Sequence, residues 1–278
     1  MAVQNPSIRS IAHPTDFSDL SGVAFAHALR IALATRSKLH LLHVVPQDTG
    51  AALAFPHVRQ LLVQWGLAEQ SDPPWVVASK LGIEVDTTRI KWEQPAQGVL
   101  SFLREQPCDL LVLATHGGEG IEHWLRGSVS EIVSRHSAIP SLFLAPGARG
   151  FVSPVSGELQ LRRALVPIDY SPRADKAIEA ARRLAALLTG GGIVLHLVHV
   201  GSSAPPLPAT SAGHHLPPVM LRHGNVASTI VDVAIEFEVD LIAMPTAGHR
   251  NPLDLLRGST TERVIRHAPC PVLAIPAA

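Results

Sequence analysis

Two short segments of this chain carry residue types that bind phosphate groups. In the first, Gly117 is followed after nine residues by Gly127-Ser128; in the second, Gly248 is followed after nine residues by Gly258-Ser259. A glycine lets the backbone approach a phosphate group without a Cβ in the way. A Gly-Ser pair that opens a helix offers free N–H groups, the positive end of the helix dipole and a hydroxyl. Together they could hold a di- or triphosphate without a cluster of basic side chains.

These segments belong to an internal duplication. Asp109 to Gly117 resembles Asp240 to Gly248, and the residues up to Ser128 resemble those up to Ser259, in each case 131 positions later (240 − 109 and 259 − 128). Similarity at one fixed offset marks a repeated structural unit. The chain therefore contains two copies of one fold.

The front of each copy repeats at other offsets. His13 to Ser18 matches Val166 to Ser171 at an offset of 153, and His40 to Val44 matches His196 to Val200 at an offset of 156. Further along the chain the offset falls from 156 to 131, so the second copy is 25 residues shorter (156 − 131) between its second and third strands.

The length of 278 residues suits two domains of roughly 140 residues. We expect the first domain over 1–148, a linker over 149–157 and the second domain over 158–278. In the first domain, 46–82 has room for a helix between strands two and three. Its counterpart, 201–218, is rich in Pro, Ser and Gly and predicts a loop.

Each copy alternates short apolar runs with helix-period segments, which predicts an α/β fold: two doubly wound, parallel, five-stranded, Rossmann-like domains. The expected strands are 8–14, 39–45, 83–90, 109–114, 141–145, 163–168, 193–200, 218–222, 240–244 and 271–275. Buried helix faces are expected at Ala174, Ala177, Ile178, Ala181, Leu184, Ala185 and Leu188, at Ala96, Val99, Leu100 and Leu103, and at Ala227, Ile230, Val231 and Ala234.

The glycine segments resemble those of the ATP-binding universal stress proteins, whose motif at this point is Gly-x2-Gly-x9-Gly-Ser/Thr. Both copies match its last three positions, while Ala114 and Pro245 replace the first glycine. Proline lacks an N–H group and fixes φ, which weakens the match in the second copy. The resemblance covers nearly the whole chain and implies a tandem member of this family, of the adenine nucleotide alpha hydrolase-like fold.

The resemblance also implies a role for two further positions in each copy. An aspartate ends strand one near the base and ribose, matched by Asp16 and Asp169, and an apolar residue at the end of strand two packs on the adenine, matched by Val44 and Val200. The implied ligand is ATP (or ADP or AMP), with Mg²⁺ or Mn²⁺. The candidate nucleotide contacts are Pro14, Thr15, Asp16, Val44, Ala114, His116, Gly117, Gly118, Gly127, Ser128, Val129, Pro167, Asp169, Val200, Gly248, Gly258, Ser259 and Thr260.

Some of these residues have an interpretation that needs no ligand. Ser128 and Glu131 fit a capping box, as do Ser259 and Glu262, and a cap by itself stabilises a helix by about 1 kcal/mol. Asp16 and Asp169 could likewise initiate helices, with Ser18 and Ser171 as caps.

The sequence favours a regulatory or stress-response protein that binds ATP, most of all in the first copy. It has no Gly-x-Ser-x-Gly elbow, no Gly-x4-Gly-Lys-Ser/Thr loop and no His-Glu-x-x-His motif, so at most slow ATP hydrolysis is expected. The alternative is an interaction scaffold of the same fold that binds no nucleotide.

Composition narrows the class of protein. The 23 basic residues balance the 23 acidic ones, so a nucleic-acid binder is not expected near neutral pH. No apolar run is long enough for a membrane span and no secretory signal is recognised. Two isolated cysteines point to a reducing compartment, so a cytoplasmic location is expected. No metal site is expected, because paired histidines such as His40 and His43 would lie on opposite faces of a strand.

The fifth strand of each copy should form an apolar sheet edge, and such edges invite pairing. Universal stress proteins commonly dimerise through this strand. We therefore expect the two copies to pair here as an internal pseudo-dimer, which leaves room for a homodimer of whole chains and for an unidentified protein partner.

Overall fold

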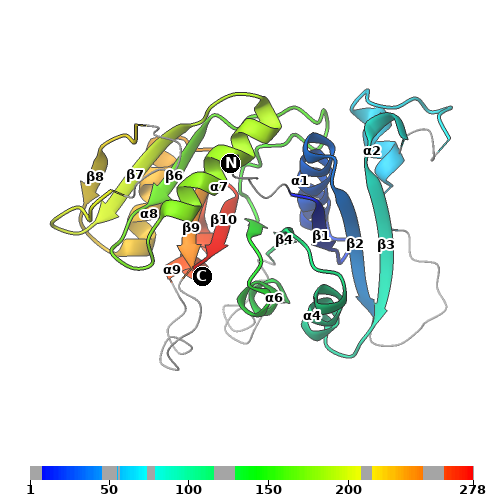
Figure 1. Ribbon diagram of the computed structural model, residues 1–278, viewed down its shortest axis with the longest axis horizontal. Coiled ribbons are helices and arrows are strands. Elements are labelled where there is room, and N and C mark those ends of the chain that lie inside the picture. The colour runs from blue at the N-terminus through cyan, green and yellow to red at the C-terminus, as the bar shows by residue number, and fades with distance from the viewer. Residues whose placement is uncertain are drawn as a thin grey trace, which may run out of the picture.

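The computed structural model describes residues 8–45, 55, 57–73, 79–115, 129–207, 215–246 and 260–277. Ten strands form one sheet that runs across the molecule from β3 to β8 (Figure 1). The strands are β1 (Ser10–Pro14), β2 (Lys38–Val45), β3 (Glu84–Lys91), β4 (Leu110–Ala114), β5 (Ser141–Leu144), β6 (Arg163–Pro167), β7 (Val194–Val200), β8 (Val219–Arg222), β9 (Leu241–Thr246) and β10 (Val272–Pro276). All ten predicted strands are present, with ends that differ from the prediction by at most two residues.

The strand order shows two copies of a doubly wound unit joined edge to edge. The order is β3-β2-β1-β4-β5-β10-β9-β6-β7-β8, and the strands within each half are parallel. At the junction β5 and β10 are antiparallel, with Phe143 opposite Val272 and Leu142 opposite Leu273. The expected pairing through the fifth strands is present, and it merges the two half-sheets into one.

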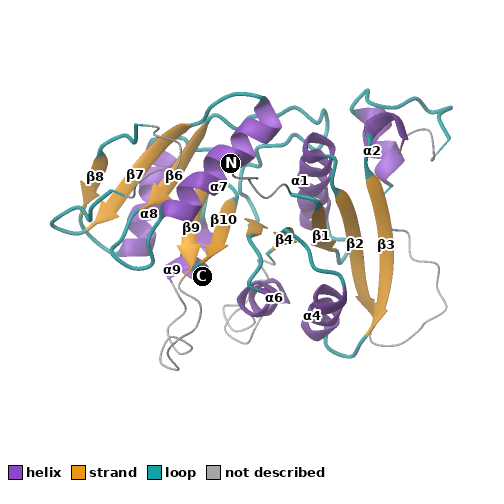
Figure 2. Cartoon of the chain, viewed as in Figure 1, coloured by secondary structure: helices purple, strands orange, loops and turns teal. Residues whose placement is uncertain are grey.

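Helices cover both faces of the sheet (Figure 2). On one face, α1 (Asp19–Thr35) and α7 (Asp175–Thr189) pack on apolar side chains such as Ile11, Val112 and Leu273. The opposite face is covered by α4 (Pro95–Glu105), α6 (Val129–Ser137), α8 (Val226–Glu236) and α9 (Thr260–His267). Neighbouring strand residues alternate between the two cores, as the pleat of a strand requires.

The predicted helix faces are buried with one exception. Every expected residue of α7 and α4 is buried, as are Ala227, Ile230 and Ala234 of α8. Val231 is only half-buried, and Val233 is buried instead. On α8 the buried stripe continues from Ile230 to Val233, three residues on, which is one of the two spacings that keep residues on one face of a helix.

The extra length of the first copy includes the short helix α2 (Val58–Gln64), followed by Trp65. In the second copy, the described residues 201–207 and 215–218 contain no helix. Trp65 is buried against the first core and its indole N–H donates to the carbonyl of Pro154 at 3.1 Å. The α2 region therefore contacts the segment that joins the two copies.

The joining segment is itself packed. Phe151 and Val152 are each about 1% exposed, and the amide of Arg149 donates to the carbonyl of Pro269 at 2.8 Å. Glycine, serine and proline residues around them had predicted a linker. The structure shows that its two apolar residues belong to the core beside α1.

Candidate functional site

The strand order reverses at β1, which has β2 on one side and β4 on the other. In doubly wound sheets, ligands bind beyond the carboxyl ends of the strands at such a switch point. Pro14, Val44 and Ala114 are at or next to the carboxyl ends of these three strands, and Asp16 follows β1 by two residues. The fold thus brings together four predicted site residues from three separate parts of the sequence.

The turn after β1 fixes the position of Asp16. Its Oδ1 accepts hydrogen bonds from the amide and the hydroxyl of Ser18, at 3.1 and 2.7 Å. Ser18 is the N-cap of α1, and its hydroxyl oxygen accepts from the amide of Ser21 at 3.2 Å. The predicted cap at Ser18 is confirmed, and the Asp16 residue that supports it is exposed at the switch point.

A buried polar network lies beneath this turn. The hydroxyls of Thr15 and Ser21 are 2.8 Å apart, and Ser21 Oγ lies 3.4 Å from Nε2 of His13. The Nδ1 of His13 lies 2.9 Å from the carbonyl oxygen of Val112 on β4. Burial of His13 lowers its pKa from 6.5 to about 4, so the ring is neutral at physiological pH. The network ties β1, α1 and β4 together directly below the crevice.

At the described switch point of the second copy, apolar residues replace this network. At the offset of 153, Val166 replaces His13, Ile168 replaces Thr15 and Ala174 replaces Ser21, and all three are buried. Apolar side chains there need no hydrogen-bond partners. The two switch points therefore differ in the polarity of their supporting cores.

The end of β2 presents different residues to the two faces of the sheet. Val44 lies against α4, where a Cβ on Gly98 would be only 2.9 Å from its Cγ1 atom. On the other face, Nδ1 of His43 lies 2.7 Å from the carbonyl oxygen of Thr15 and its ring contacts that of Phe17. His40 contacts Phe102 of α4, so His40 and His43 do lie on opposite faces.

On the β4 side, Thr115 follows the strand and is buried, with its amide and hydroxyl both directed to the carbonyl of Leu144. Helix α6 begins at Val129, directly after Gly127-Ser128 in the sequence, and Ser130 is buried. The predicted residues His116, Gly117, Gly118, Gly127 and Ser128 lie outside the described residues. The same holds for the caps Ser128 and Ser259, and for Gly248 and Gly258 in the second copy.

In the second copy, Pro167, Asp169 and Val200 lie at the corresponding carboxyl ends, and α9 begins at Thr260. Asp169 is exposed and its Oδ1 accepts from the amide of Tyr170 at 2.7 Å. The prediction that Ser171 caps the next helix is wrong. Helix α7 begins later, at Asp175, which places an acid in its first turn that is paired with Arg173 at 3.0 Å.

Two aspartates that sequence reasoning missed hold the start of each copy. Oδ2 of Asp109 accepts from the amides of Arg9 and Ser10, at 2.7 and 3.0 Å. Oδ2 of Asp240 accepts from the amides of Arg162 and Arg163, at 2.8 and 2.9 Å. The only signal in the sequence was that both aspartates stand at the same place in the repeat, just before strand four.

The cysteines and the metal-ligating residue types offer no further candidate site among the described residues. Cys108 and Cys270 are free and buried; burial raises the pKa of both thiols, that of Cys270 to about 12. Among the described residues, no group of three or more His, Cys, Asp or Glu side chains is arranged to hold a metal ion. None of the helices in the described part of the chain is long and apolar enough to cross a membrane.

Comparison with known proteins gives the family. The model of the universal stress protein family matches residues 7–144 and 207–276, which is more than half of the chain. The chain belongs to the universal stress protein family. A universal stress protein of Methanocaldococcus jannaschii is 29% identical over 138 residues, which are 48% of this chain and 80% of that protein. Universal stress protein YxiE of Bacillus subtilis is 28% identical over 140 residues, 46% of this chain and 93% of the relative.

Solved structures extend the similarity over both copies. A universal stress protein from Archaeoglobus fulgidus aligns with a TM-score of 0.65 and 23% identity, over 97% of this chain and 96% of that one. A functionally unknown protein from Pseudomonas aeruginosa aligns with a TM-score of 0.64 and 18% identity, over 97% and 93%. At these identities the likeness shows the fold, which is that of a universal stress protein with a duplicated domain.

Proposed function

We propose that this universal stress protein binds an adenine nucleotide at the switch point of its first copy, with ATP as the favoured ligand and ADP or AMP as the alternatives. The observation that carries the proposal is the convergence of Asp16, Val44 and Ala114 at the carboxyl ends of β1, β2 and β4. The bound nucleotide would act as a signal read by a protein partner, with slow hydrolysis at most.

The start of α6 supports a site for the phosphate groups. The described part of the helix starts at Val129, which follows the Gly127-Ser128 pair in the sequence, and it packs against α4 on the same side of the sheet as Val44. The first N–H groups of a helix have no partner within it and favour an anion. An anchored base at Val44 and a phosphate chain at α6 would span the crevice from β2 to β4.

Mg²⁺ or Mn²⁺ would enter with the nucleotide. Mg²⁺ in nucleotide sites needs only one or two carboxylates beside the phosphate oxygens and its own waters. Asp16 supplies one exposed carboxylate at the switch point, held in place by Ser18. The residues present thus fit a cation that is held mainly by the nucleotide.

The second copy supports binding less well. Pro245 replaces the first glycine of the motif and is part of β9, opposite Ile275 of β10. It has no N–H group to offer a phosphate. We therefore assign the nucleotide to the first copy and a supporting, interaction role to the second.

Purified full-length protein tests the proposal. After denaturation, mass spectrometry of the supernatant should detect adenine nucleotide, and ATP should bind again on addition. Gly127→Val should abolish this in the first copy, whereas Gly258→Val should have little effect. Gly192→Val is the matched control, because the space around Gly192 is open. Protein that carries no nucleotide and fails to bind ATP at millimolar concentration would refute the proposal and leave the scaffold alternative.

A further inference from the structure

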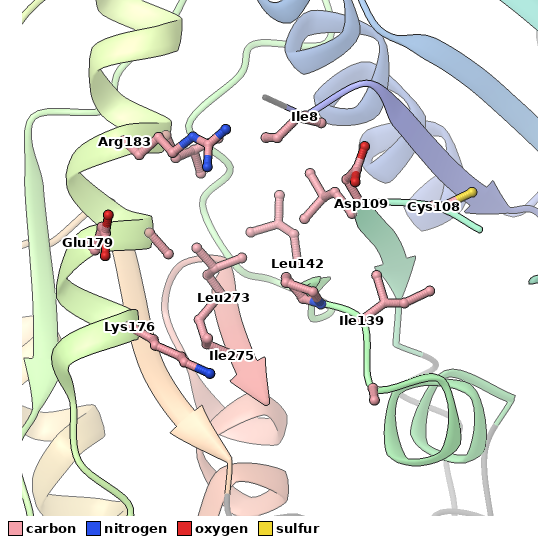
Figure 3. A pocket seen from close by; sticks show the side chains of 15 residues that line it. Ile8, Cys108, Asp109, Ile139, Leu142, Lys176, Glu179, Arg183, Leu273 and Ile275 are labelled. Carbon is pink, nitrogen blue, oxygen red and sulfur yellow. The ribbon is translucent and has the colours of Figure 1, made fainter. Parts of the chain in front are cut away.

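A cavity of about 500 Å³ lies at the junction of the two copies (Figure 3). Its floor is formed by Leu142, Leu273 and Ile275, from the paired strands β5 and β10. One wall is α7, and the other consists of residues just before β1, β4 and β5. The cavity thus lies at the amino-terminal ends of the first copy's strands, away from the switch point, and its volume is within the ~300–1,000 Å³ of ligand sites.

The duplication allows this cavity to be compared with its counterpart in the other copy. Helices α1 and α7 correspond at the offset of 153, because the buried positions Ala24, Phe25, Ala28, Ile31 and Ala32 fall on buried positions of α7. Residues of the fourth and fifth strands correspond at 131, so the counterpart of Asp109 is Asp240. Across the junction, the counterpart of Ala180 on α7 is His27 on α1.

The counterpart of the cavity is filled by the joining segment, Arg149 to Val152. The guanidinium of Arg149 donates to Oδ1 of Asp240 at 3.1 Å, and its amide donates to the carbonyl of Pro269. Two residues later, the ring of Phe151 packs edge-on against the imidazole of His27, with centroids 4.6 Å apart. The filled groove therefore accepts a basic residue and, two positions on, an aromatic one.

Compared with the filled groove, the cavity retains an aspartate that can bind a basic residue and has more room for an aromatic one. Asp109 holds the start of β1 with Oδ2, as Asp240 holds β6, but Oδ1 of Asp109 accepts no hydrogen bond from any described residue. Asp240 is only 6% exposed beneath Arg149, whereas Asp109 is exposed. Ala180 occupies the position that corresponds to His27, which contacts Phe151 in the filled groove. Because alanine is smaller than histidine, the cavity has room for a larger apolar group.

The charges around the mouth are compatible with such an occupant. Lys176, Glu179 and Arg183 line it from α7, and none of the three forms an ion pair with another described residue. Figure 3 shows the Arg183 side chain on the α7 side and the Asp109 carboxylate on the opposite side of the cavity. The counterpart of Arg183 at the offset of 153 is Arg30 on α1, so the helix that flanks the filled groove also carries an arginine at this position.

We propose that the junction cavity docks an extended peptide segment of a protein partner, with a basic residue that pairs with Asp109 and an aromatic residue two positions later over Ala180. The segment would imitate the way in which Arg149 and Phe151 fill the related groove. This inference does not depend on nucleotide binding, because the cavity and the switch point share no residue.

A labelled peptide with the sequence of residues 147–153 provides the probe, with fluorescence anisotropy on the full-length protein as the readout. We expect saturable binding, and peptides with Ala at the basic or at the aromatic position should each bind about tenfold more weakly. Asp109→Asn keeps the acceptor for Arg9 and Ser10 but removes the charge, and should weaken binding about tenfold. Asp232→Asn, an equal charge change on α8 across the sheet, is the control.

Ala180→Phe fills the cavity from α7 and should abolish peptide binding. Thermal unfolding at the wild-type temperature would show that this variant is folded, and Leu184→Phe provides a second blocking variant if it is not. The proposal is overturned if the peptide does not bind up to millimolar concentration, or if it binds equally well to both blocked variants. It is also overturned if a labelled fatty acid binds the cavity and the peptide does not.

Discussion

The imidazole Nε2 of His27 lies 3.2 Å from the backbone nitrogen of Val152 and accepts its N–H bond. The other ring nitrogen, Nδ1, donates to the carbonyl of Val23 at 2.8 Å. One nitrogen accepts and the other donates, so the ring must be neutral. A side chain in the middle of α1 thereby holds the segment that joins the two copies.

This relationship predicts that the protein loses stability in mild acid. Burial lowers the pKa of His27, and also that of His13, from 6.5 to about 4. Below pH 6.5 the unfolded chain binds protons at both positions while the folded chain does not, until about pH 4. The free energy of unfolding should therefore fall as the pH drops through this window, by ~1 kcal/mol per pH unit for each histidine. Urea titrations at pH 7, 6 and 5 measure it.

His27→Gln serves as the control, because its amide oxygen can accept from Val152 without titrating. The slope of unfolding free energy against pH should fall by ~1 kcal/mol per pH unit in this variant, and the slope that remains belongs to His13, His40 and His196, whose pKa values burial also lowers. A slope between pH 7 and 5 that is unchanged by the substitution would contradict the role assigned to His27.

The buried network of His13, Thr15 and Ser21 predicts strong coupling between these residues. His13→Val alone leaves Ser21 and the Val112 carbonyl with fewer partners, and should cost ~1–3 kcal/mol. The triple variant His13→Val, Thr15→Ile, Ser21→Ala installs the residues of the second copy and should be more stable than His13→Val. Chemical denaturation checks the order. If the free-energy costs of the three single substitutions add up to the cost of the triple variant, the network has no cooperative role.

The sheet was predictable because its signal is local and occurs twice. Ten apolar runs gave ten strands, and the apolar fifth strands predicted that Ser141–Leu144 would pair with Val272–Pro276. At the switch point, Asp16, Val44 and Ala114 were placed together because the carboxyl ends of parallel strands meet at one edge. A repeat at fixed offsets carried each inference from one copy to the other.

What the sequence did not predict depends on contacts between distant segments. Phe151 and Val152 were assigned to a linker because glycines and prolines surround them, yet they are buried against α1. Whether an apolar residue in such a segment is buried depends on what lies beside it in space. Likewise, Ser171 had the residue type and position of a cap, but the helix that follows begins at Asp175.

The two strand-holding aspartates should differ in their contribution to stability. Each accepts two backbone amides, but Asp240 is buried and also pairs with Arg149, whereas Asp109 is exposed. Asp240→Ala should cost ~2–4 kcal/mol because buried amides and a guanidinium lose their acceptor, and Asp109→Ala about half of that. Denaturant unfolding compares the two, and equal losses would mean that burial and the ion pair contribute nothing.

Asp16 should matter for nucleotide affinity and Asp169 should not. If Asp16 accepts a ribose hydroxyl or faces the cation, Asp16→Ala should weaken ATP binding about tenfold or more. Asp169→Ala, in the copy with Pro245, should leave the affinity unchanged. Isothermal titration calorimetry of both variants tests this. The α1 cap is provided by Ser18, so α1 should remain folded in Asp16→Ala; equal loss in both variants would place the nucleotide elsewhere.

Two glycines with nearly the same positive φ test how firmly the joining segment is held. Gly157 has φ +70°, and a Cβ there would lie 2.6 Å from Cδ2 of Trp65; Gly190 has φ +67° and open space around it. Both Gly→Ala changes carry the strain of a positive φ, about 1 kcal/mol. Only Gly157→Ala must also displace the Trp65 ring, whose indole donates to Pro154. It should therefore lower stability by ~1–3 kcal/mol more than Gly190→Ala, as overpacked sites do. Similar melting temperatures for the two variants would show that Trp65 moves freely and does not secure the segment.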